Sequence, residues 1–275
     1  MLRSCLCLIF GAALGASGVP HAQDDMHAPL DRILDTYVRD GYVYYRALEA
    51  ERSALDRYVA SLDVPRARIE SWGREDQASF WVNAYNALVL RTVINAYPIN
   101  GRSPDYPSNS IRQVPGAFDG VKHRVGGGVL TLDDLDRSVV AGFGDARLVL
   151  ALGRGALGSP RLRSEAYRGS RLEQQLAQVV KECATRFNCI RVDADSRLLE
   201  VTPIVSWREA AFIASFAGEG ERRWPNRSPI ERALAAMVHP HLFASEREFL
   251  EANTFRMQYG DFDWRLNDLT GGVPY

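Results

Sequence analysis

The sequence lacks a charge excess of either sign. Its 275 residues include 33 Lys and Arg against 34 Asp and Glu, a net charge of −1, and it has no lysine-rich or acidic tail. A protein that binds nucleic acid needs a basic face to neutralise phosphates, so this balance argues against that class. The 46% hydrophobic content is ordinary for a soluble globular protein.

The sequence also lacks an apolar run that approaches the ~18 residues needed to cross a bilayer. The longest candidate, CLCLIFGAAL at residues 5–14, follows Arg3 and precedes the small residues of GASG. This order of charge, apolar stretch and small residues is typical of a signal peptide, the alternative being a buried N-terminal helix. We expect residues 1–22 to be a signal peptide and residues 23–275 to form a single domain, periplasmic or secreted, with no membrane span.

Cysteine is scarce, with four residues in the whole chain. Removal of the signal peptide leaves Cys183 and Cys189, in KECATRFNCIRV. The pair lacks the C-x-x-C spacing usual for redox centres, and it is too small a ligand set for zinc. In an oxidising compartment it could close a small disulfide loop, and we predict that bond. Two free buried thiols are the alternative.

Hydrophobic periodicity predicts several helices and a small antiparallel sheet, and hence a single α+β domain. Residues 74–97 are the strongest helix, because acidic residues open it and Pro98 ends it. Thr131 is predicted to cap a further helix after a hairpin at 122–130. The other predicted helices cover residues 30–37, 48–62, 172–187, 207–216 and 229–237; strands are predicted at 146–152, in a hairpin at 190–205 and in an extended segment at 257–266.

Three glycines, Gly153, Gly155 and Gly158, stand at G-x-G-x-x-G spacing in RLVLALGRGALGSPRL. A dinucleotide-binding turn has a strand before these glycines and a helix directly after them. Here Pro160 follows the third glycine almost at once, and the next residues lack helical periodicity. We therefore predict no nucleotide cofactor, and indeed no cofactor of any kind.

Ser159 is a candidate nucleophile, but LGSPR is not the G-x-S-x-G nucleophile elbow. A serine needs a base, and His123, before the predicted hairpin turn, is the weak candidate. His239 and His241 form only a weak metal signal, and we predict no metal site.

The predicted helix at 74–97 carries two amides, Asn83 and Asn86, at i and i+3, so they share one face. Amides among apolar residues are costly to bury unless they form hydrogen bonds. They either tie down neighbouring loop backbone or line a cleft and contact a ligand. The late segment YGDFDWRLND is expected to be a structural clamp near the C-terminus.

Several segments together resemble the domain of unknown function 547 family. The specific ones are FWVNAYNALVLRTVINAYP and FGDARLVLALGRGALGSPRLRSEAYRG, supported by SIRQVPGAF, VGGGVLTLDDLDRSVV and YGDFDWRLN. The order and spacing match over about residues 30–267. The resemblance implies a compact single domain in an exported bacterial protein. It implies no established biochemical role.

The chain departs from the family pattern at two places. Members usually carry a loop of the form C-A-S-x-G-C-P, and here Arg154 and Ser159 stand at the two cysteine positions. Members also often show Ile-Glu-His after the glycine hairpin, where this chain has Leu135, Asp136 and Arg137. Arginine is always protonated, so it cannot replace a histidine base. Any cysteine–histidine chemistry of relatives is therefore lost here.

Two hypotheses for a functional site follow from these observations, and a purely structural or assembly role is the remaining alternative. In the first, the domain is non-catalytic and binds a small anionic ligand or a protein partner in a cleft near Asn83 and Asn86, with Arg137, Arg154 and Arg161 supplying positive charge. In the second, it is a hydrolase or acyl-transfer enzyme of papain- or transglutaminase-like α+β architecture, with Ser159 as nucleophile and His123 as base.

Overall fold

The computed structural model describes residues 25–270, and its central element is the long helix α6, Arg74–Ala96. Glu75 and Asp76 occupy the first turn, where carboxylates oppose the positive end of the helix dipole. Side chains all round the helix are buried from Ala78 to Leu90, because other elements cover it on several sides. The predicted signal peptide, residues 1–22, lies outside the described residues.

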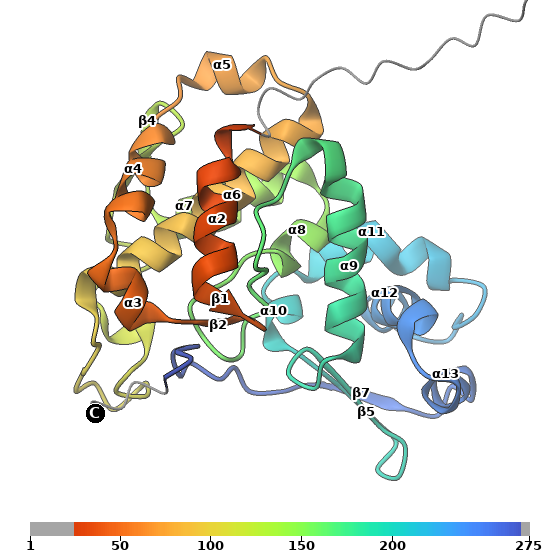
Figure 1. Cartoon of the computed structure of the whole chain (residues 1–275). Coiled ribbons are helices and arrows are strands. Elements are labelled where there is room, and N and C mark those ends of the chain that lie inside the picture. The colour runs from red at the N-terminus through yellow and green to blue at the C-terminus, as the bar shows by residue number, and fades with distance from the viewer. Residues whose placement is uncertain (1–24, 271–275) are drawn as a thin grey trace, which may run out of the picture.

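Two of the N-terminal helices, α3 (Tyr45–Ala50) and α4 (Ser53–Ser61), pack against α6 (Figure 1). The helix predicted at 48–62 is interrupted at Glu51, whose carboxylate accepts a hydrogen bond from the Tyr37 hydroxyl at 2.7 Å. The elements are α2 (Ala28–Tyr37), β1 (Val38–Arg39), β2 (Tyr42–Val43), α3 (Tyr45–Ala50), α4 (Ser53–Ser61) and α5 (Arg66–Glu70).

The glycine hairpin and its helix cap form as predicted. Strands β3 (His123–Val125) and β4 (Gly128–Leu130) are antiparallel, and both turn glycines have positive φ, which a tight hairpin turn requires. The Thr131 side chain and the Asp134 carboxylate then form a capping box. Helix α7 (Leu132–Asp134) continues into a π-helical turn, Leu135–Val140.

The strand predicted at 146–152 is wrong: Ala146–Leu150 is the short helix α8. Gly144 takes the left-handed conformation, and the Asp145 side chain accepts from the backbone N–H of Arg147 at 2.9 Å, which caps the helix. The spacing of apolar residues in a short buried run does not distinguish a helix from a strand. Here the flanking Gly144 and Asp145 favour the start of a helix.

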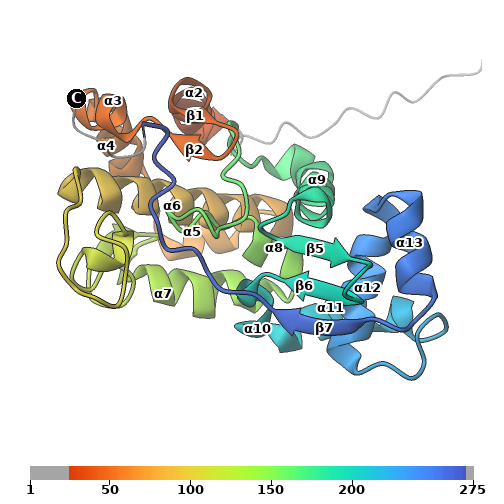
Figure 2. The same ribbon diagram turned by 90° about the horizontal axis from the view of Figure 1, so that it is seen from below.

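The second half of the chain surrounds a three-stranded sheet (Figure 2). Strands β5 and β6 form the predicted antiparallel hairpin, whereas β7 runs parallel to β6, so the sheet is mixed. The elements are α9 (Leu172–Thr185), β5 (Ile190–Asp193), β6 (Leu198–Val201), α10 (Pro203–Ser206), α11 (Glu209–Gly220), α12 (Pro229–Val238), α13 (Ala244–Glu251) and β7 (Arg256–Tyr259).

The chain closes with an extended stretch, residues 260–267, called here the closing segment. It runs from β7 across the molecule to the β1–β2 hairpin (Figure 2), where Asn267 O accepts from the backbone N–H of Val43 at 2.9 Å. The Asn267 side chain also donates to Gly41 O at 2.7 Å, as expected of a structural clamp. Both halves share one hydrophobic core, and the predicted single α+β domain is confirmed as the fold class.

Candidate functional site

A cavity of about 680 Å³ opens beside residues 153–162, called here the cavity loop. Its volume lies within the roughly 300–1,000 Å³ typical of ligand pockets. Its lining comes from the β1–β2 turn, the start of α3, the middle of α6, the cavity loop, the turn after α9, the end of β6 and the closing segment. The charged side chains on its lining are Asp40, Arg161, Arg186, Glu200, Asp261, Asp263 and Arg265.

Two glycines of the cavity loop, Gly155 and Gly158, are explained by the backbone conformation and by a close backbone contact. Gly155 has a φ of +66°, and a Cβ on Gly158 would lie 2.6 Å from the backbone nitrogen of Asp263. This close approach lets Gly158 N donate to Asp263 O at 2.9 Å, which joins the cavity loop to the closing segment. The helix α8 precedes the loop and no helix directly follows it, so the G-x-G-x-x-G spacing has a structural cause.

The closing segment presents alternate side chains to the cavity, as an extended chain must. Asp261, Asp263 and Arg265 lie on the cavity lining. Phe262 and Trp264 are absent from that lining, and their ring centroids lie 4.3 Å apart.

The two amides of α6 tie down loop backbone. Asn86 accepts from Gly153 N at 2.8 Å and donates to Ala151 O at 3.1 Å. Asn83 accepts from Tyr167 N at 2.9 Å and donates to Tyr167 O at 2.7 Å. Asn86 lines the cavity and Asn83 does not. Of the two readings of these amides, the structure therefore supports the tying of backbone.

The predicted arginines separate into three environments. Arg154 is buried, and its guanidinium forms an ion pair with Asp136 at 3.0 Å, which a second arginine, Arg208, also contacts at 3.0 Å. Arg137 is 66% exposed and pairs with Asp133 at 3.1 Å. Only Arg161 of the three lines the cavity. The structure thus does not bring Arg137 and Arg154 together beside Asn83.

Ser159 and His123 are not brought into contact. Ser159 lines the cavity, and its Oγ accepts the backbone N–H of Arg154 at 2.8 Å, the one hydrogen bond of that oxygen within residues 25–270. His123 is buried on β3, where Nδ1 lies 3.3 Å from the Arg91 guanidinium. Burial and the positive charge of Arg91 lower the pKa of His123 to about 4. His239 instead contacts Glu251 at 2.7 Å.

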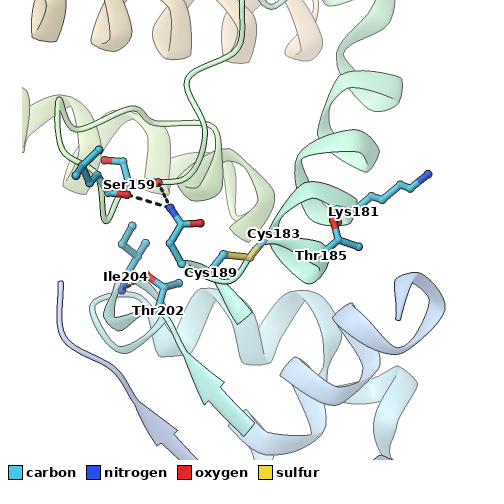
Figure 3. The surroundings of a disulfide bond; sticks show 9 residues. Ser159, Lys181, Cys183, Thr185, Cys189, Thr202 and Ile204 are labelled. Atoms are coloured by element: carbon cyan, nitrogen blue, oxygen red, sulfur yellow. Dashed lines mark hydrogen bonds between the residues drawn. A yellow bond between two sulfur atoms is a disulfide. The ribbon is translucent and has the colours of Figure 1, made fainter. Parts of the chain in front are cut away.

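The predicted disulfide between Cys183 and Cys189 is present, with the two Cα atoms 5.0 Å apart. It joins the last turn of α9 to the residue before β5, and it closes a turn of residues 183–189, called here the disulfide turn. Within this turn, the Asn188 side chain donates to the carbonyl oxygens of Leu157 at 3.0 Å and Ser159 at 3.3 Å (Figure 3). The disulfide turn therefore holds the cavity loop in place.

Positive charge gathers where the disulfide turn meets the cavity loop. Arg161 contacts Asp40 at 3.4 Å and Glu182 at 3.1 Å, and Arg186 pairs with the same Asp40. Glu182 is also shared with Arg163, at 3.0 Å. Three guanidinium groups on this side thus share two carboxylates, apart from the further pair that Arg163 forms with Glu165.

The remaining wall of the cavity is acidic. Glu200 lies at the end of β6, and its pKa is lowered by hydrogen bonding to Arg191. Asp263 pairs with Arg265, which likewise lowers the pKa of the Asp263 carboxyl. On the lining, Arg161 and Arg186 thus stand beside one carboxylate, Asp40, whereas the other wall carries Glu200, Asp261 and Asp263 with Arg265.

Sequence reasoning missed several cavity residues: Asp40, Arg186, Phe187 and Asn188. The signal that could have found three of them is the stretch CATRFNC, in which a large apolar side chain and a cation stand between two bonded cysteines. The placement of Asp40 depends on tertiary packing and has no local signal.

The part of the chain that the structure describes contains neither a candidate metal site nor a candidate membrane-spanning helix. It contains no group of three or more His, Cys, Asp or Glu side chains able to hold a metal ion. Between residues 25 and 270, no helix combines the length and apolarity needed to cross a membrane.

Residues 69–182 match the family model described as "Protein of unknown function, DUF547". The match confirms the family resemblance. It includes α6 and the cavity loop and ends one residue before Cys183, so the whole disulfide turn, the three-stranded sheet and the closing segment lie beyond it. No curated protein matches the chain, and no solved structure matches it either.

Proposed function

We propose that this chain is an exported, non-catalytic domain that binds a small anionic ligand in the cavity beside the cavity loop. The observation that carries the proposal is the pair Arg161 and Arg186, which both line the cavity and share the Asp40 carboxylate. Asp40 is 65% exposed, so its charge is largely hydrated and its ion pairs are weak. A carboxylate or phosphate group entering the cavity forms charge-assisted hydrogen bonds with these guanidinium groups.

The ligand site differs from the cleft expected from the sequence. Arg161 and Asn86 remain on it, whereas Arg154 is committed to Asp136 and Arg137 to Asp133. Asn83 contributes indirectly, because its amide fixes Tyr167 in the chain that follows the cavity loop.

Export is part of the proposal. It rests on the signal-peptide pattern of residues 1–22 and is compatible with a disulfide, which persists in oxidising compartments. A mature chain that begins after the signal peptide, recovered from outside the cytoplasm, is the expected result of fractionation followed by mass measurement.

The absence of catalysis rests on the surroundings of Ser159. Its hydroxyl oxygen already accepts a backbone hydrogen bond, and the buried histidine on β3 contacts Arg91 instead. The alternative is a hydrolase or acyl-transfer enzyme with Ser159 as nucleophile. A fluorophosphonate probe distinguishes the two, with Ser159→Ala as control. We expect no labelling, and labelling that disappears in Ser159→Ala would overturn the non-catalytic assignment.

Ligand binding is tested by thermal unfolding with sodium propionate at constant ionic strength, with chloride as the compensating anion. A ligand that binds the folded state raises Tm. We expect propionate to raise the Tm of the wild type and to have little effect on the Arg161→Gln/Arg186→Gln variant. Arg66→Gln, which removes an exposed guanidinium that pairs with Glu70 and does not line the cavity, is the matched control. An equal rise in the double variant, or no rise in any protein, would refute the proposal.

A further inference from the structure

An exposed aromatic side chain stands at the rim of the cavity. Phe187, in the middle of the disulfide turn, is 79% exposed and belongs to the lining. Tyr42, in the β1–β2 hairpin, is a second exposed aromatic residue on the lining. Other exposed large apolar side chains, among them Val129 and Phe243, lie away from it. Exposed apolar side chains on the lining of a cavity are typical of a ligand-binding site, where they pack against the apolar part of the ligand.

The backbone around Phe187 is held firmly. The disulfide fixes both ends of the turn, and two backbone N–H groups, those of Cys189 and Ile190, donate to Arg186 O at 2.9 Å and 3.0 Å. Asn188 clamps the cavity loop. The guanidinium carbon of Arg191, in β5, lies 5.8 Å from the centroid of the Phe187 ring. The backbone of the turn therefore loses little entropy when a ligand covers the ring.

Arg186, directly before Phe187 in the chain, supplies a cation to the same cavity. The consecutive residues Arg186 and Phe187 of this constrained turn thus supply a guanidinium group and an apolar ring to one cavity. Among anions, this pairing favours those that carry an apolar group next to the charged one.

We infer that the disulfide turn is a recognition turn, and that Phe187 selects organic anions bearing an aromatic ring over small hydrated anions. The inference rests on the proposed function, because it assigns the class of ligand to the same cavity. The anionic group contacts Arg161 and Arg186, and the ring packs against Phe187. The disulfide positions this contact, since it fixes the turn on which both residues lie.

The test is calorimetric titration with 3-phenylpropionate, propionate and 3-phenyl-1-propanol. We expect the wild type to bind 3-phenylpropionate about tenfold or more tightly than propionate, since covering a ring removes a large apolar area from water. The alcohol, which lacks the charge, is expected to bind more weakly than 3-phenylpropionate. Phe187→Ala is expected to remove most of the preference between the two anions, because it lowers the affinity for 3-phenylpropionate far more than the affinity for propionate.

Phe243→Ala is the matched control, because Phe243 is 73% exposed and lies outside the cavity. The Cys183→Ser/Cys189→Ser variant is expected to lose part of the preference in the folded protein. Equal wild-type affinity for the two anions would overturn the inference, as would a preference that Phe187→Ala leaves unchanged. In both cases propionate binding that depends on Arg161 and Arg186 would leave the proposed function standing. Failure of both anions to bind would overturn both.

Discussion

Arg154 and Arg161 lie on the same loop, but Arg154 is buried in the protein and Arg161 lines the cavity. Arg154 is buried beneath Trp207, its guanidinium carbon 5.6 Å from the indole centroid, and it is paired with Asp136. Arg161 lies on the cavity and shares carboxylates with neighbouring arginines. Arg154 also donates to Leu152 O at 3.1 Å, so it stabilises the loop from inside. A guanidinium with this many internal partners has little capacity left for a ligand, whereas a partly exposed one keeps it.

The same division applies to the other polar groups. Asn83 and Asn86 form hydrogen bonds with backbone, and the buried His123 has a guanidinium neighbour. These groups maintain the fold. The proposed ligand contacts instead come from Arg161 and from the disulfide turn, which line the cavity.

Asp136→Ala removes the anion of the buried network and leaves the Arg154 guanidinium buried without its partner. Breaking a buried ion pair in this way costs about 3–5 kcal/mol. We expect a loss of that size in the free energy of unfolding, measured with urea. Asp133→Ala, which breaks the exposed pair with Arg137, is the control and should cost less than about 1 kcal/mol. Similar losses in both variants would remove the distinction between buried and exposed pairs.

His123 makes the buried region sensitive to acid. Its folded pKa of about 4 lies below the ordinary value of 6.5, so the unfolded chain binds the proton more readily. Its contribution to stability is complete above pH 6.5 and is lost as the pH falls towards 4. With about 1.36 kcal/mol per pKa unit, the loss reaches at most about 3 kcal/mol. Unfolding curves of wild type and His123→Gln should diverge over this range. Parallel pH dependences would show that His123 is not buried in its neutral form.

The disulfide is expected to contribute less to the free energy of unfolding than Asp136 or His123. A cross-link between cysteines six positions apart restricts a short loop of the unfolded chain, which the chain-entropy relation values at about 2 kcal/mol. We expect Cys183→Ser/Cys189→Ser to have a lower Tm than the wild type and to be insensitive to dithiothreitol, whereas reductant lowers the wild-type Tm towards that of the variant. An unchanged wild-type Tm in reductant, with reduction verified by mass, would contradict this.

Local patterns predicted much of the fold. Helix α6, the two hairpins, the Thr131 cap and the disulfide depend on residues close in sequence, and all were predicted. The strand expected at 146–152 is wrong because the capping role of Asp145 was overlooked. The parallel β7 depends on contacts between distant segments, which no local period contains.

The site was predicted only in part. The cavity loop and Arg161 were selected, but Arg186, Phe187 and Asp40 were not, since contacts between distant segments, such as the Arg186–Asp40 ion pair, bring them to one cavity. Arg137 and Arg154 were singled out by their place in the family pattern, and sequence alone does not reveal that nearby carboxylates occupy both.

An NMR titration of the arginine side-chain Nε–H resonances with propionate at constant ionic strength tests directly whether the cavity arginines bind an anion. We expect saturable shifts with one common Kd for Arg161 and Arg186, and unchanged resonances for Arg137 and Arg154. Shifts confined to Arg137 and Arg154, or equal shifts of all exposed arginines without saturation, would contradict the proposed binding.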